Sequence, residues 1–177
     1  MKTVIIPKTE LYDEDKNEFI SIKDTKLTIE HSLISIKKWE ERWKVPFLKT
    51  EKTAEQFLDY IRCMTINNVD ENIYRFIPSK ILQEIVDYIA DPMTATWFSN
   101  NETIGAQKKE TEIVTAEIIY YWMIALNIPM EFQKWHLNSL LTLIRVVSIK
   151  NEPKKKMSDR EWALQRSRLN KARSKHK

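Results

Sequence analysis

Histidine and cysteine side chains are the first candidates for chemistry in this chain, because they serve as bases, nucleophiles and metal ligands. The chain has three histidines, His31, His136 and His176, and a single cysteine, Cys63. The histidines are far apart in sequence and stand in neither the HExxH nor the ExxH spacing of metal sites. We therefore interpret His136 as a helix histidine with a local hydrogen bond. We interpret Cys63 as a buried structural thiol.

The glycine content and the acidic pairs exclude further classes of functional site. Gly105 is the single glycine, whereas dinucleotide fingerprints, phosphate-binding loops and EF-hand loops need glycine at several fixed positions. The acidic pairs Glu40-Glu41 and Asp70-Glu71 fall on predicted polar faces or in loops, and nothing predicts that they converge as catalytic carboxylates do. We expect a protein that is not an enzyme and that uses no cofactor and no metal.

The charge is distributed unevenly along the chain. Residues 1–149 carry 18 basic against 22 acidic residues, a net charge of −4, and residues 150–177 carry 11 against 3, a net charge of +8. We call residues 150–177 the basic tail. Such a segment can bind nucleic-acid phosphates, fold on an acidic protein surface, or serve only as a solvated end.

Tryptophans and basic residues provide the candidate contacts with a partner. Four of the six tryptophans fall on apolar helical stripes and are predicted core residues: Trp39, Trp43, Trp122 and Trp135. Trp97 lies in an irregular stretch, and Trp162 stands alone in the basic tail, where it could anchor the tail to another surface. The predicted partner-binding set is Trp97, Trp162, Lys154, Lys155, Lys156, Arg160, Arg166, Arg168 and Arg173.

Residues 1–31 are expected to form strands. Apolar runs at 4–6, 19–22 and 27–29 predict two or three antiparallel strands, with a turn at Asp24-Thr25. A sheet this small needs a partner to pack on, so we expect it to lie against the helical body that follows.

Residues 32–149 are expected to form that helical body. Helical apolar spacing predicts about five helices: from Ser32 to Pro46, from Thr50 or Thr53 to Asn67, from Pro78 to Asp91, from Thr111 or Glu112 to Leu126, and from Phe132 to Val147. A short helical turn is expected over 70–77 and a surface loop over 93–111. The helix ending at Leu126 is apolar on nearly every side, as in a buried or interfacial helix.

The predicted fold is therefore α+β, mainly α: a small N-terminal antiparallel sheet, a bundle of about five helices and a basic C-terminal extension, helical or disordered. Neither a secretion signal nor the ~20-residue apolar run of a membrane span is found. We expect a soluble chain with no membrane partner.

Several runs of the sequence resemble one family of proteins. They lie at 27–40, 59–65, 88–96 and 113–124, and the clearest are QKWHLNSLLTLIR at 133–145 and PKKKMS at 153–158. Together they resemble small proteins from the tail modules of long-tailed bacteriophages, a family associated with tail assembly chaperones encoded close to the tape measure protein. The resemblance spans about residues 1–175.

The resemblance implies a non-catalytic function. Tail assembly chaperones keep the long, helical, aggregation-prone tape measure protein soluble, help tail tube subunits assemble around it, and then leave. The implied partners are the tape measure protein and the tail tube protein, with a homo-oligomer as a further partner. The implied location is the host cytoplasm, with the protein absent from the mature virion.

Two other functions stay open at this point. The basic tail suits a nucleic-acid-binding or host-interfering phage protein, for which nucleic acid would be the partner. A minor structural part of the virion, such as a tail completion protein, is the third hypothesis.

Overall fold

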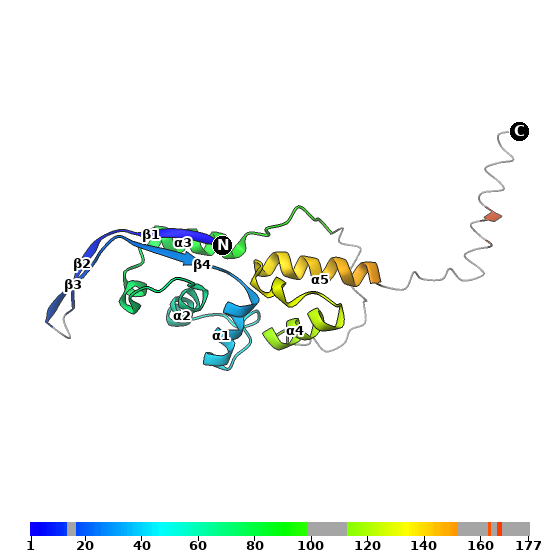
Figure 1. The fold of residues 1–177 in the computed structure, drawn as a ribbon, viewed down its shortest axis with the longest axis horizontal. Helices are drawn as coiled ribbons and strands as arrows, with labels where there is room; N and C mark the ends of the chain where they lie inside the picture. The colour runs from blue at the N-terminus through cyan, green and yellow to red at the C-terminus, as the bar shows by residue number, and fades with distance from the viewer. Residues whose placement is uncertain (14–16, 99–112, 152–162, 164–165, 168–177) are drawn as a thin grey trace, which may run out of the picture.

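The structure is a computed structural model that describes residues 1–13, 17–98, 113–151, 163 and 166–167 (Figure 1). Its elements in chain order are β1 (Lys2–Ile6), β2 (Thr9–Asp13), β3 (Glu18–Ile22), β4 (Thr25–Ile29), α1 (Leu33–Trp43), α2 (Ala54–Met64), the 3-10 helix η1 (Glu71–Phe76), α3 (Ser79–Ala90), α4 (Ala116–Ala125), the 3-10 helix η2 (Met130–Lys134) and α5 (Leu137–Asn151). This order confirms the predicted fold class, a mainly helical chain with a small antiparallel sheet at its N-terminus.

The strands form one long two-stranded ribbon in two parts. β1 pairs with β4 and β2 pairs with β3, both antiparallel. Figure 1 shows β1 and β4 lying along the helices while β2 and β3 extend away from them as an arm. The described residues therefore hold four strands, where the sequence predicted two or three.

The predicted turn at Asp24-Thr25 is wrong, because the chain continues there from β3 into β4 without reversing. Pro7 interrupts the opposite side of the ribbon at this point. The Asp24 carboxylate accepts a 2.7 Å hydrogen bond from the Lys8 backbone N–H across the ribbon. Asp24, which helped to predict a turn, instead stabilises the junction between the β2–β3 pair and the β1–β4 pair.

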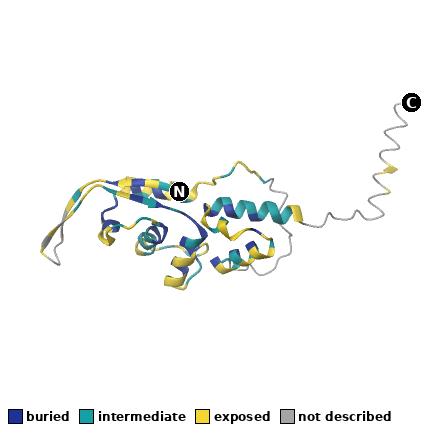
Figure 2. Cartoon of the chain, in the orientation of Figure 1, coloured by how far each residue is buried: buried dark blue, intermediate teal, exposed yellow. Residues whose placement is uncertain are grey.

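One face of the β1–β4 sheet belongs to the hydrophobic core. Val4, Ile6, Leu27 and Ile29 are all buried and join the core formed by the helices. Their alternation with less buried neighbours is the period-2 pattern of a half-buried strand. Figure 2 shows the same division, with buried residues where the sheet meets the helices and exposed or intermediate ones along the coloured part of the arm.

Helices α1 and α2 begin at predicted capping residues, Ser32 for α1 and, of the two candidates Thr50 and Thr53, Thr53 for α2. Ser32 caps α1 and Thr53 caps α2, each with a reciprocal side-chain bond from the residue three positions later, Ser35 or Gln56. These short-range bonds satisfy backbone N–H groups that have no partner inside the helix. Trp39 donates from its indole to the Gln56 carbonyl at 2.9 Å, which ties α1 to α2.

Helix α4 begins later than expected, at Ala116 rather than at Thr111 or Glu112, because residues 113–115 are not helical. The Glu40 side chain, on α1, sets this boundary. It is 8% exposed, and its carboxylate accepts hydrogen bonds from the Ala116 N–H at 2.7 Å and the Phe47 N–H at 2.8 Å. A carboxylate at the N-terminus of a helix also interacts favourably with the helix dipole.

The helix expected over 132–147 is interrupted. It is divided into η2 and α5 by Trp135 and His136, and Trp135 has an extended backbone. The Leu137 N–H at the start of α5 donates to the His31 carbonyl at 2.9 Å. A long-range contact therefore breaks a stretch whose apolar spacing is continuous in sequence. Among the described residues, no helix combines the length and apolar character that crossing a membrane requires.

Candidate partner-binding groove

Two histidines that are distant in sequence lie together in the fold. His31 follows β4 and His136 precedes α5, and their ring centroids are 4.9 Å apart in an edge-on arrangement. Both side chains are buried. The prediction of a helix histidine with a local hydrogen bond is wrong: His136 lies between η2 and α5, and its Nε2 lies 3.0 Å from the carbonyl of Tyr88, on α3.

The surroundings of the two imidazoles keep them neutral. Burial, with smaller contributions from His136 and Lys52, lowers the pKa of His31 to about 3. Burial also lowers the pKa of His136. Since a carbonyl only accepts, Nε2 of His136 carries the proton, and its buried Nδ1 has no hydrogen-bond partner among the described residues. His31 Nδ1 bonds the Tyr60 hydroxyl. The pair thus connects β4, α2, α3 and α5.

Cys63 is a buried free thiol, as the sequence predicted. Burial, reinforced by the nearby Asp59 carboxylate, raises its pKa to about 11. A thiol with that pKa is protonated at neutral pH, and the thiolate is the nucleophilic form. Among the described residues, no group of three or more histidine, cysteine, aspartate or glutamate side chains is placed to hold a metal ion.

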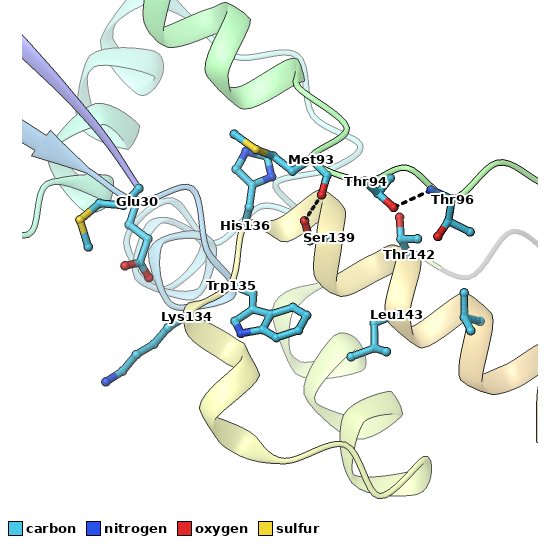
Figure 3. A pocket seen from close by; sticks show the side chains of 12 residues that line it. Glu30, Met93, Thr94, Thr96, Lys134, Trp135, His136, Ser139, Thr142 and Leu143 are labelled. Carbon is cyan, nitrogen blue, oxygen red and sulfur yellow. Dashed lines mark hydrogen bonds between the residues drawn. The ribbon is translucent and has the colours of Figure 1, made fainter.

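An open groove of about 610 Å³ lies beside the histidine pair, along α5 (Figure 3). We call it the α5 groove. Its lining residues are Met1, Glu30, Met93, Thr94, Thr96, Lys134, Trp135, His136, Ser139, Thr142, Leu143 and Val146. One wall is α5, the opposite wall is the irregular segment 91–98, and the N-terminus and the end of β4 lie at one end.

Polar side chains from the first turn of α5 hold the segment wall in place. Ser139 donates from its hydroxyl to the Met93 carbonyl at 2.8 Å. Asn138 donates from its amide to the Ile89 carbonyl at 3.1 Å and to the Asp91 carbonyl at 2.7 Å. Met93 has a positive φ of 49°, and its N–H donates to the Asp91 carboxylate at 2.8 Å. The side chain of Met93 is therefore presented at the rim by a tight Asx turn.

The rim of the groove is apolar and accessible. Met1 is 73% exposed, Met93 is 43% exposed and Trp135 is 44% exposed. The prediction that Trp135 belongs to the core is wrong, because the break between η2 and α5 turns its ring outward, where it packs on Phe132 at a centroid distance of 4.2 Å. Trp39 is fully buried, and Trp43 and Trp122 are partly buried against the core.

The predicted partner-binding residues are not in the groove. Trp97 is 90% exposed and lies farther along segment 91–98, outside the groove lining. Arg166 is helical and exposed. The other members, Trp162, Lys154, Lys155, Lys156, Arg160, Arg168 and Arg173, lie outside the described residues.

Sequence reasoning missed the rim residues Met1, Met93 and Trp135. Trp135 is at an apolar stripe position, so its spacing gave no sign of exposure. The Asp91-Pro92 pair predicts a helix stop. An aspartate there also favours an Asx turn, and that turn was the signal in the sequence for the position of Met93.

Comparison of the chain with protein families, with curated proteins and with solved structures finds no match.

Proposed function

We propose that this chain is a non-catalytic tail assembly chaperone of a long-tailed phage, which binds the tape measure protein through the α5 groove. The observation that carries the protein-binding function is the groove itself, with its exposed Met1, Met93 and Trp135. The identity of the client is supported by the sequence resemblance alone. We propose that the protein acts in the host cytoplasm and is absent from the mature virion.

The shape of the groove suits an amphipathic helix. Ser139, Thr142, Leu143 and Val146 line it from α5, a stripe that spans about 10 Å at 1.5 Å per residue. Two turns of a client helix match that length, and helix-in-groove recognition uses apolar anchors spaced one turn apart.

The chemistry of the rim suits a client with varied sequence. Methionine is flexible and polarisable, so it adapts to anchors of different shape, and tryptophan supplies a large, rigid contact. Glu30 and Lys134 lie together toward one end of the groove (Figure 3), so a client helix would meet both signs of charge there. The unpartnered Nδ1 of His136 adds one buried acceptor in the lining.

Co-expression with the tape measure protein of the same phage tests the proposal. We expect the chain to raise the soluble fraction of that protein and to be recovered in a complex with it. Trp135→Glu should reduce recovery at least tenfold, since it places a charge where an apolar anchor binds. Ile66→Glu, at a 54% exposed residue outside the groove, is the matched control. Unchanged solubility together with no recovered complex would refute the proposal.

The basic tail favours a second candidate, a nucleic-acid-binding or host-interfering protein. Its net charge of +8 over residues 150–177 is the observation behind it. Binding through that tail should weaken steeply with salt and disappear when the tail is removed. A third candidate, a minor virion component, predicts that the protein is found in purified particles by mass spectrometry, where a chaperone is absent.

A further inference from the structure

The two outer edges of the β1–β4 sheet differ in whether their backbone groups are hydrogen-bonded. On the β4 edge, the Asn67 side chain makes the hydrogen bonds that a neighbouring strand would make. Its amide oxygen accepts from the Thr28 N–H at 2.8 Å, and its amide nitrogen donates to the Lys26 carbonyl at 2.8 Å. The Ile66 N–H donates to the Thr28 carbonyl at 3.0 Å, and the Glu30 N–H donates to the Met64 carbonyl at 2.9 Å. The β4 edge is therefore closed.

The β1 edge has no such cover. Since the backbone groups of Lys26 and Thr28 point away from β1, their register partners Ile5 and Thr3 point their own N–H and C=O groups away from β4. No hydrogen bond joins these groups to any other described residue. Figure 1 shows β4 between β1 and α2, and α3 running beside β1.

The side chains at this edge leave the approach open. Val4 and Ile6 are buried on the face that meets the helices, and Lys2 on the same face donates from Nζ to the Glu84 carbonyl of α3 at 2.8 Å. The Lys2 side chain therefore does not lie along the β1 edge, where its charge would oppose pairing with another strand. Thr3 is exposed and Ile5 is 65% exposed on the other face. Natural proteins commonly protect strand edges from pairing, and this one is protected only where Pro7 ends it.

The geometry points to a second copy of this chain as the occupant, with the two β1 strands pairing antiparallel across a two-fold axis at Val4. In that register Thr3 lies opposite Ile5 of the second copy, and Ile5 lies opposite Thr3. Each opposed pair exchanges two backbone hydrogen bonds, so all the unpaired groups of Thr3 and Ile5 are satisfied. The same surface serves both copies, as a two-fold interface requires.

The charges at this edge allow this occupant, and the small area of contact sets how strongly it binds. The register places Lys2 opposite Ile6 of the second copy, so the lysines do not oppose one another directly. The product is a four-stranded sheet, a size more stable than an isolated strand pair. Two five-residue strands bury less than the roughly 1,200 Å² of a standard specific interface. The dimer should therefore be weak and concentration-dependent.

A charge-swap experiment with the full chain tests the inference. Analytical ultracentrifugation from micromolar to millimolar concentration should show a reversible monomer–dimer equilibrium for the wild type. The paired substitution Thr3→Lys with Ile5→Lys should keep the chain monomeric, as should Thr3→Glu with Ile5→Glu, because like charges would face each other. An equal mixture of the two variants should form a heterodimer. Ile124→Lys, at a 67% exposed residue of α4, is the control and should dimerise like the wild type.

Three results would overturn the inference: a wild-type chain that stays monomeric throughout, lysine variants that dimerise normally, or a mixture that does not associate. Thr3→Pro gives an independent check, since it removes an outward N–H and leaves the β1–β4 ladder bonds in place. If the wild type is monomeric and Thr3→Pro weakens binding of the tape measure protein, the edge binds an extended client segment instead. That outcome also overturns the second-copy assignment and leaves the α5 groove untouched.

Discussion

Acidification should destabilise this protein through His31 before most of its carboxylates titrate. The His31 side chain is 2% exposed, and its pKa of about 3 lies well below the 6.5 of an unfolded histidine. The groups near its imidazole are the hydroxyl of Tyr60, the imidazole of His136 and the ammonium group of Lys52, and the Tyr88 hydroxyl accepts from its backbone N–H. None of these is an anion that would stabilise a protonated imidazole.

The direction follows from proton binding in the two states. Below pH 6.5 the unfolded chain takes up a proton at His31 and the folded chain does not, so stability is complete above pH 6.5 and is lost as the pH falls toward 3. The loss is about 1.4 kcal/mol per pH unit. Between pH 7 and pH 5 His31 should therefore remove about 2 kcal/mol of unfolding free energy, and His136 acts in the same direction.

Urea unfolding at a series of pH values measures this effect. His31→Gln removes the titrating group, so its stability should depend less on pH between 7 and 5, by about 2 kcal/mol. The variant is less stable at pH 7 because its packing changes, but only the slope matters for the test. Carboxylates titrate equally in both proteins and cancel in the comparison. Equal slopes for the two proteins would refute the account of His31 as a buried neutral imidazole.

Three further predictions concern Glu40, Asn67 and Cys63. Glu40→Gln should lower the unfolding free energy by about 1–3 kcal/mol, because one backbone N–H of Phe47 or Ala116 then faces an amide donor. The control is Glu41→Gln, at an exposed ion pair with Lys37, which should change the unfolding free energy by less than about 1 kcal/mol in the same urea titration. Asn67→Ala should speed hydrogen exchange at the Thr28 amide while exchange in α5 stays unchanged, and an unaltered Thr28 rate would contradict the closed β4 edge. Cys63 should react with a disulfide reagent at pH 8 roughly 100-fold more slowly than an unfolded thiol, and fast reaction of the folded protein would contradict its burial and raised pKa.

Features set by neighbouring residues could be predicted from the sequence. The capping bonds of Ser32 and Thr53 span only three residues, so the sequence predicted Ser32 as the start of α1 and Thr53 as one of two candidate starts of α2. The end of α3 before Asp91-Pro92 was predicted for the same kind of local reason, since proline excludes a helical residue before it.

Features set by contacts across the chain could not be predicted in this way. The interruption between η2 and α5 depends on the His31 carbonyl, more than a hundred residues away from Leu137. The start of α4 depends on the Glu40 carboxylate. The α5 groove likewise needs Met93 and Trp135 on one rim, and their proximity is produced by the bonds of Asn138 and Ser139 to segment 91–98.

Hydrogen exchange of the chain with and without a helical segment of the tape measure protein tests the central claim most directly. The account predicts slower exchange on binding in segment 91–98 and in the first half of α5, the two walls of the groove, with no change in β2 and β3. Trp135→Glu should abolish the protection, and Ile66→Glu should preserve it. Binding that protects only residues outside the groove, or no binding at all, would contradict the claim that the α5 groove holds the client.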